Sequence, residues 1–207
     1  LLMQGYYSNS LTSCAGTDAN SSVSATCFNL SDIATQGELG YTVVMYYSWM
    51  GIHRNQQQLL LDSLAANNMM LLVDLTHKME DIACGGTAGD PNSNCTKDPA
   101  ALADAWAAVE RQISRWKSHP GVLGWYVCDD CFSQYLMRQV EAGTPSLDRY
   151  YAKIKAIDPA HIIVGANNAD INYAFTHASE LAPRPSLDVV MEEDYAEELA
   201  ECQAVPD

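Results

Sequence analysis

The stretch WKSHPGVLGWYVCDD, residues 116–130, holds the strongest structural signals in the chain. Its His119-Pro120-Gly121 step predicts the end of a helix, because proline lacks an amide hydrogen and disfavours helical geometry in the residue before it. The apolar run 122–127 that follows predicts a strand covered on both faces. Asp129 and Asp130 come directly after this run. The stretch therefore predicts a helix, a buried strand and then two carboxylates where the strand ends.

The same alternation of strand and helix extends along the chain in both directions. Asp98-Pro99 is typical of a helix start, with an aspartate cap and a proline in the first turn. We expect a loop rich in Gly, Asn and Asp between the third strand and that helix. The expected strands are 1–7, 41–47, 69–75, 122–127, 162–166 and 187–191. The expected helices are 30–39, 55–67, 100–117, 146–157 and 171–181.

Repeated strand-helix units predict a parallel α/β protein, and we expect one domain over residues 1–207. Two architectures fit this alternation. A TIM-type (β/α) barrel has eight strands and roughly 250 residues, so this chain supplies about six βα units of an incomplete barrel. A doubly wound open parallel sheet accommodates six strands as they stand. The alternation alone leaves both architectures open.

Three segments resemble the (β/α)8-barrel retaining glycoside hydrolases. Residues 116–130 are similar to their fourth strand, in which a His-Pro step leads to a Leu-Gly-Trp-Tyr strand and an acidic pair. Residues 187–195, LDVVMEEDY, resemble their sixth strand, and Gly5-Tyr6-Tyr7 resembles the end of their first. The element order agrees along nearly the whole chain. The resemblance favours the barrel over the open sheet.

The resemblance also implies catalytic candidates. Asp130 stands where those hydrolases carry the acid/base glutamate, with Asp129 beside it, and Glu193 offers a substitute carboxylate from the sixth strand. Retaining cleavage requires two carboxyl groups about 5–5.5 Å apart. The sequence departs from the family pattern, because aspartate is one methylene shorter than glutamate and Cys131 replaces the usual proline. The family nucleophile follows a seventh strand, which we do not find here. Solvated loop acids are the competing interpretation of the Asp129-Asp130 pair.

Further polar and aromatic residues lie at the ends of the expected strands. In a barrel these ends form one face, where the sites of such folds are built. Trp125 and Tyr126 either stack on sugar rings or pack in the core. The expected substrate-binding residues are Tyr7, Asp74, His77, Trp125, Asn167, Asn168 and Tyr195. We expect no cofactor. We also expect no metal ion, because the five histidines lack the spacing that puts two imidazoles on one helix face.

Charge and cysteine content restrict the partners and the compartment. A net charge of -15 repels nucleic acid and anionic membranes, and the sequence contains no apolar run long enough for a membrane span. Seven cysteines and three glycosylation sequons predict a secreted, extracellular protein. The sequons begin at Asn20, Asn29 and Asn94. We expect local disulfides Cys14–Cys27 and Cys84–Cys95, while Cys128 and Cys131 pair with each other or elsewhere.

Two functions follow from these observations. The first is an extracellular glycoside-hydrolase-like domain that acts on or binds carbohydrate, using paired carboxylates if it is catalytic. The second is a non-catalytic, glycosylated structural or filament protein on the same fold. The second arises because cysteines and sequons are expected in the strand-to-helix loops, where glycans would crowd the mouth of the barrel. An unclosed barrel edge or an unpaired cysteine would then serve self-assembly.

Overall fold

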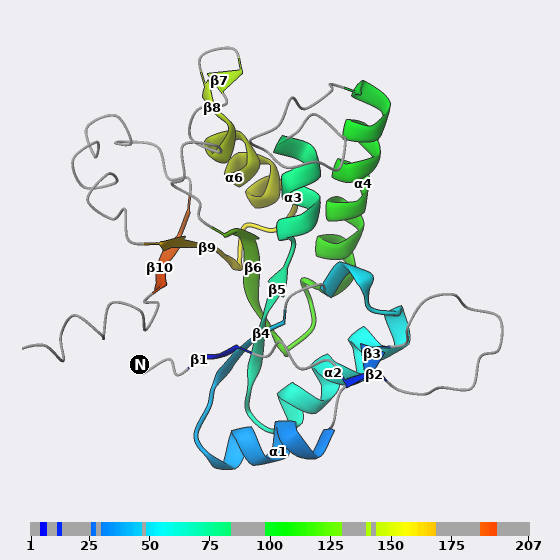
Figure 1. The fold of residues 1–207 in the computed structure, drawn as a ribbon, viewed down its shortest axis with the longest axis vertical. Helices are drawn as coiled ribbons and strands as arrows, with labels where there is room; N and C mark the ends of the chain where they lie inside the picture. Colours follow the sequence, from blue (N-terminus) through cyan, green and yellow to red (C-terminus); the bar gives the residue numbers. More distant parts are fainter. Residues whose placement is uncertain are drawn as a thin grey trace, which may run out of the picture.

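The structure is a computed structural model that describes residues 5–7, 12–13, 26–27, 30–46, 49–83, 98–129, 140–141, 144–168 and 187–193. Six strands form one sheet, and each neighbouring pair is parallel (Figure 1). In spatial order they are β1 (Gly5–Tyr7), β4 (Val43–Tyr46), β5 (Met70–Asp74), β6 (Val122–Cys128), β9 (Ile162–Asn168) and β10 (Val189–Glu193). All six expected strands are confirmed over the described residues; residues 1–4 of the first and residue 47 of the second lie outside them.

Helices follow the strands as expected, with one addition. They are α1 (Leu30–Glu38), α2 (Arg54–Ala66), α3 (Thr76–Ala83), α4 (Pro99–Trp116) and α6 (Ser146–Ile157), with a 3₁₀ turn, η1 (Trp49–Gly51). The start of α4 is confirmed, because Asp98 Oδ1 accepts hydrogen bonds from the amides of Ala100 and Ala101. The expected helix 171–181 lies outside the described residues.

Helix α3 replaces the first part of the loop that we expected after the third strand. Asp74 Oδ1 accepts a hydrogen bond from the Thr76 amide at 2.9 Å, which satisfies one of the amides that a helix start leaves unpaired. Met79 and Ile82, three residues apart, are buried in the core. Two buried apolar residues among the described side chains of this eight-residue helix give too short an apolar pattern to predict from sequence.

Two short antiparallel ribbons, also unexpected, complete the described elements. The strands β2 (Thr12–Ser13) and β3 (Thr26–Cys27) pair with each other, as do β7 (Val140–Glu141) and β8 (Thr144–Pro145). One cysteine, Cys128, therefore does not lie in a strand-to-helix loop as expected, whereas Cys27 lies in the connection between β1 and α1. Cys27 belongs to β3, and Cys128 is the last residue of β6.

The strand order decides between the two architectures. A doubly wound sheet reverses its strand order at a switch point, so that its helices cover both faces. Here the six parallel strands follow one another in space as they do in the chain. Right-handed crossovers between strands in sequential order place the helices on one face. The sheet is therefore singly wound, as in a barrel, and the doubly wound alternative is wrong.

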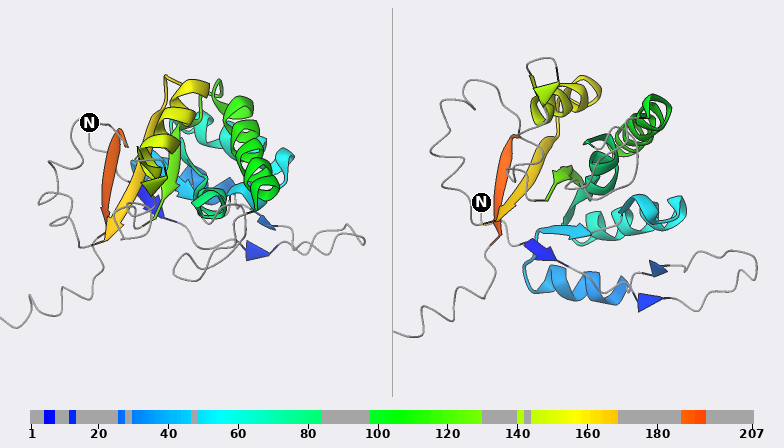
Figure 2. Two further views of the ribbon diagram at one scale, coloured as in Figure 1. Left: turned by 90° about the horizontal axis from the view of Figure 1, so that it is seen from above. Right: turned by 45° about the horizontal axis from the view of Figure 1, so that its top comes forward.

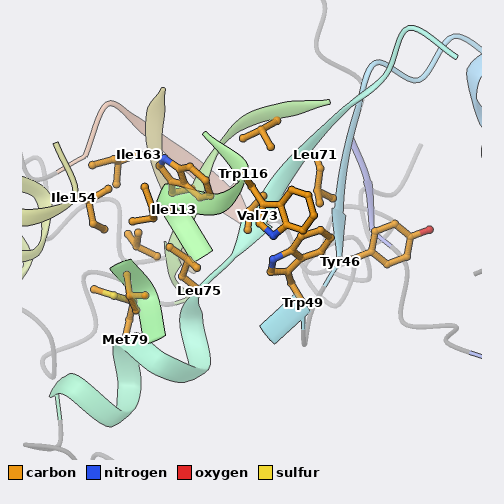
Figure 3. Packing of buried hydrophobic residues seen from close by; sticks show 14 of the residues in the cluster. Tyr46, Trp49, Leu71, Val73, Leu75, Met79, Ile113, Trp116, Ile154 and Ile163 are labelled. Atoms are coloured by element: carbon orange, nitrogen blue, oxygen red, sulfur yellow. The ribbon is translucent and has the colours of Figure 1, made fainter. Parts of the chain in front are cut away.

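Two separate clusters of buried side chains agree with a one-sided arrangement. The larger cluster combines strand residues with residues of the helices, including Leu64 of α2 and Ile113 of α4. Figure 3 shows this cluster, in which the rings of Trp49 and Trp116 meet edge to face at 6.2 Å. The second cluster is built from strand residues alone. Its buried members are Val43, Met45, Leu72, Tyr126, Val164 and Ala166. The second cluster marks the inner face of the barrel, and the helices lie outside it (Figure 2).

At the amino-terminal end of the strands, the buried Asp158 joins β6 to β9. Its Oδ2 accepts hydrogen bonds from Trp125 Nε1 at 2.9 Å and from the His161 ring at 2.8 Å. Its Oδ1 accepts from the amides of Ala160 and His161. Burial acts to raise the pKa of Asp158, but the hydrogen bond from Trp125 and the interactions with His161 hold that pKa below the ordinary aspartate value.

Asp188 connects α6, β9 and β10 at the same end of the sheet. Its Oδ1 accepts a hydrogen bond from the Tyr151 hydroxyl, and its Oδ2 accepts one from the Ile163 amide, both at 2.8 Å. Lys155 Nζ lies 2.7 Å from Oδ2. Burial acts to raise the pKa of Asp188, and the bonds from Lys155, Ile163 and Tyr151 outweigh it and lower that pKa. The contacts of Asp158 and Asp188 therefore stabilise the amino-terminal end of the barrel.

Candidate functional site

The carboxyl ends of β5 and β6 bring Asp74, Tyr126 and Asp129 together. Asp74 and Tyr126 are register partners in the sheet, and the Leu75 amide donates a hydrogen bond to the Tyr126 carbonyl at 2.8 Å. The Tyr126 hydroxyl donates to Asp129 Oδ1 at 2.7 Å. Two carboxylates and a phenol thus come from residues at the carboxyl ends of two neighbouring strands, and the phenol is hydrogen-bonded to one of the carboxylates.

Asp74 is a buried carboxylate that is held by hydrogen bonds from Thr76. Only 1% of Asp74 is exposed. Its Oδ1 accepts from the Thr76 amide at 2.9 Å and from the Thr76 hydroxyl at 2.6 Å. A buried carboxylate has to be hydrogen-bonded to be tolerated, and these two donors come from the start of α3. Helix α3 therefore orients one of the acidic groups of the site.

A β-bulge precedes Asp129. The register between β6 and β9 runs from Tyr126 opposite Val164 to Cys128 opposite Gly165, so β6 contains one extra residue there. Bulges of this kind bend a strand and redirect the side chains that follow. The bulge lies directly before the acidic pair that the sequence singled out.

Known proteins resemble this chain in structure and not in sequence. No protein-family model matches it, and no curated protein matches it. Xylanase 10C from Cellvibrio japonicus superposes with a TM-score of 0.51 at 12% identity, covering 84% of this chain and 39% of the xylanase. The β-galactosidase from Rahnella sp. R3 gives 0.51 and 12%, covering 80% and 37%. A psychrophilic family 10 endo-β-1,4-xylanase gives 0.51 and 12%, covering 85% and 67%.

The chain has the fold of a TIM-type (β/α) barrel. The sequential parallel sheet and its one-sided helices are the features that it shares with these enzymes, and the expected incomplete TIM-type barrel is confirmed. The chain spans 37–67% of the lengths of the three proteins. At 12% identity this similarity establishes the fold.

Several predicted site residues lie at the carboxyl-terminal mouth of the barrel. Tyr7 is the last residue of β1 and is in register with Met45. Asn168 ends β9 opposite Glu193, which ends β10, and Asn167 pairs with Glu192 in the same register. The predicted positions on β9 and β10 therefore lie side by side. Glu193, on β10, is two strands away from β6. His77 lies in the first turn of α3 and is exposed.

Trp125 is placed away from this mouth. It is fully buried in the helix-facing cluster, and its indole donates to Asp158 at the opposite end of the strands. Alternation along β6 explains the position, since Trp125 and Tyr126 must face opposite sides of the sheet. The expectation that Trp125 binds substrate is therefore wrong, and packing in the core is its role. Tyr126, one residue later, is the aromatic residue on the inner face.

Other predicted residues lie outside the described residues: Asp130, Tyr195, Cys14, Cys84, Cys95, Cys131, Asn20, Asn29 and Asn94. Cys128 takes part in a disulfide bond, and the identity of its partner stays a prediction. Within the described ranges, no group of three or more His, Cys, Asp or Glu side chains could hold a metal ion. No helix in those ranges is long and apolar enough to cross a membrane.

The Tyr126–Asp129 pair is the feature of the site that sequence reasoning missed. Strict alternation puts residues three apart on opposite faces of a strand, so the two side chains were not expected to meet. No glycine or proline marks the bulge between them. The only available signal was the acidic pair itself, directly after an apolar run.

Proposed function

We propose that this chain is an extracellular domain that binds carbohydrate at the carboxyl-terminal mouth of its barrel. The observation that carries the proposal is that Asp74, Tyr126 and Asp129 lie at the carboxyl ends of adjacent strands, with the Tyr126 hydroxyl donating to Asp129. Enzymes with barrel folds build their sites at this face. Carboxylates form strong, charge-assisted hydrogen bonds with hydroxyl donors, which a sugar presents in abundance. The net charge of -15 favours a neutral glycan over an anionic one.

Glycoside hydrolysis is the reaction that such a site would perform. Asp130 directly follows Asp129 and is the proposed proton donor. Glu193, at the end of β10, is the proposed second carboxylate. A separation of about 5–5.5 Å between their carboxyl groups would give retention, and about 6.5–9.5 Å would give inversion. Glu193 ends β10, two strands from β6 in the same sheet, and Asp129, which precedes Asp130 in the sequence, follows β6 at the same end of the strands.

A binding and hydrolysis screen tests the proposal. The probes are aryl β-glycosides for hydrolysis and xylopentaose, the ligand of the Cellvibrio japonicus xylanase structure, for binding by calorimetry. Asp130→Asn and Glu193→Gln are expected to lower the rate constant by a factor of roughly 10² or more, as loss of a general acid or its partner does. Asp62→Asn, which alters an exposed carboxylate on α2, is the matched control and is expected to keep full activity.

Two results would contradict the proposal in different ways. If the wild-type protein neither binds nor cleaves any probe, carbohydrate is excluded as its ligand. If Asp130→Asn hydrolyses the probe at the wild-type rate, Asp130 is not the proton donor, while the proposal that the protein binds carbohydrate stands. The extracellular assignment is tested separately by expression in a secretory host, where enzymatic removal of N-glycans is expected to reduce the mass of the protein.

The edges of the sheet favour a second candidate, a non-catalytic structural protein that self-assembles. Among the described strands, β1 and β10 lie at the two ends of the sheet order. Val190 of β10 is 47% exposed although it is a large apolar residue in a strand. Edge strands pair readily with other chains. Light scattering across a concentration series tests this candidate: growth of the molar mass with concentration is expected, and a constant monomer mass argues against it.

A further inference from the structure

The bulge in β6 changes which side chains face the interior of the barrel. In a regular strand, successive side chains point to opposite faces. Trp125 faces the helices and Tyr126 the interior, and Val127 faces the helices again. Cys128 should then face the interior. Instead it packs in the helix-facing cluster next to Val127, where it is buried and disulfide-bonded. Two consecutive residues on one face show that alternation is broken at this point.

This break puts Asp129 on the same side as Tyr126. Without the extra residue, residues 126 and 129 would lie on opposite faces of the strand. With it, the Tyr126 hydroxyl reaches Asp129 Oδ1 at 2.7 Å. A separation of that size is characteristic of a hydroxyl donating to a carboxylate, among the stronger protein hydrogen bonds. The bulge and the hydrogen bond therefore act on the same carboxylate.

Tyr126 is a rigid support for this bond. No part of its side chain is exposed, and its ring packs in the inner cluster between residues of β5 and β9. Leu72 and Val164 belong to the same cluster. A tyrosine ring has two side-chain torsions, and close packing fixes both. The hydroxyl therefore presents its donor to Asp129 from a fixed position.

We infer that Tyr126 and the bulge at Val127–Cys128 position the Asp129 carboxylate at the barrel mouth as an acceptor for hydroxyl groups of a bound ligand. Tyr126 is a positioning residue, and Asp129 is the ligand-binding residue. That the ligand is a sugar rests on the proposed function. The bulge distinguishes Asp129 from an ordinary loop acid, because it brings this carboxylate to a buried donor on the inner face.

The experiment is a double-mutant cycle read out in two ways. Tyr126→Phe removes only the hydroxyl, Asp129→Ala removes its acceptor, and the third variant combines both changes. Each protein is unfolded in urea, and each is titrated with xylopentaose by calorimetry. Tyr46→Phe is the matched control, since Tyr46 is also a buried strand tyrosine but belongs to the helix-facing cluster. Asp129→Asn, which keeps an oxygen acceptor, is the conservative variant.

The expected results follow from the proposed chain of contacts. Asp129→Ala weakens xylopentaose binding by roughly tenfold or more, as loss of a hydrogen bond to a charged group does. Tyr126→Phe weakens binding by a smaller factor, and it has no further effect once Asp129 is alanine. Asp129→Asn recovers part of the affinity. Tyr46→Phe binds like the wild type. In urea, the effects of Tyr126→Phe and Asp129→Ala are not additive, because both remove the same bond.

Three outcomes would overturn the inference. Additive effects in urea would show that the Tyr126–Asp129 bond does not form. Coupling in urea with unchanged xylopentaose binding in Asp129→Ala would make the pair purely structural, while the proposed function stands. A wild-type protein that binds no sugar probe would remove the ligand role of Asp129 together with the proposed function. The urea cycle is independent of any ligand, so these failures are distinguishable.

Discussion

Asp158 shows how a single buried carboxylate can hold two strands and a turn together. It is 2% exposed and accepts hydrogen bonds from the Trp125 indole, the Ala160 amide and both the amide and the ring of His161. Because β6 and β9 are neighbours, the Trp125 bond connects the core of β6 to the turn that begins β9. Asp158 thus lies directly after α6, and its carboxylate holds the turn that leads into β9.

Replacing Asp158 by alanine is expected to destabilise the protein by about 3 kcal/mol, because it leaves buried donors without an acceptor. The free energy of unfolding in urea measures the effect. Asp62→Ala is the control: Asp62 also contacts a histidine, His119, but its side chain is 58% exposed. An exposed pair of this kind contributes about 0–1 kcal/mol. Equal losses in the two variants would contradict the role given to Asp158.

The depressed pKa values of Asp158 and Asp188 predict acid sensitivity with a definite sign. Each carboxyl has a lower pKa in the folded protein than its ordinary value of 3.8. Above that value both states are ionised, so the stabilisation is fully present. As the pH falls through 3.8 toward the lower folded values, the unfolded chain takes up protons first, and stability is lost. Urea unfolding between about pH 2 and pH 6 measures this loss.

In that titration Asp158→Asn is expected to show a shallower acid dependence than the wild type, since one of the two carboxyls no longer takes up a proton. A loss of stability that begins well above pH 5, or an identical slope in the variant, would mean that other groups govern the acid response.

At the scale of elements, the contact between β6 and β9 depends on Gly124. A Cβ atom at this position would clash with the backbone oxygen of Ile162 and would lie 2.6 Å from its Cγ1 atom. These two residues are register partners in the sheet. Any larger residue must push the two strands apart, because backbone atoms cannot be moved aside as a flexible side chain can.

Gly124→Ala is therefore expected to cost about 2–3 kcal/mol of stability through overpacking. Gly51→Ala is the matched control, since a Cβ atom at Gly51 meets nothing within 4 Å. Thermal or urea unfolding of both variants tests the difference. A Gly124→Ala protein as stable as Gly51→Ala would show that β6 and β9 are less closely packed than described.

The elements were largely predictable from sequence, and the exceptions have physical causes. The strand 69–75 begins with a continuous apolar run, 69–73, and Asp98-Pro99 indicated the start of α4. Helix α3 was missed because only two of its described residues, Met79 and Ile82, are both apolar and buried. The bulge was missed because it depends on contacts across the sheet, not on a local residue type. The carboxylates of the site were therefore predictable as strand-end acids, whereas the Tyr126–Asp129 pairing was not.

At the scale of the whole molecule, stability is expected to be highest in the middle of the sheet. The central strands β5 and β6 have neighbours on both sides and are buried on both faces, whereas β1 and β10 are the outer strands of the sheet. Local opening requires the least free energy where backbone amides and apolar contacts are fewest. Hydrogen exchange should therefore be slowest in β5 and β6 and fastest, among the sheet strands, in β10.

Hydrogen-exchange mass spectrometry with peptides covering β6 and β10 measures this order, and a difference of about 100-fold in protection is expected. The comparison is internal to one protein, so it needs no variant. Protection of β10 equal to that of β6 would indicate that β10 is covered in solution, as the self-assembling candidate requires. A dilution series would then show whether the cover is a second chain.

The sequential order of the strands also bears on how the protein is made. Each strand of the sheet docks on a strand that left the ribosome before it, so no unit has to wait for a later one to find its neighbour. Synthesis at about 5–20 residues per second gives a unit of roughly 30 residues a few seconds to settle. Hairpins and helices form in microseconds. The growing chain can therefore extend its sheet one strand at a time, in the order in which the strands are synthesised.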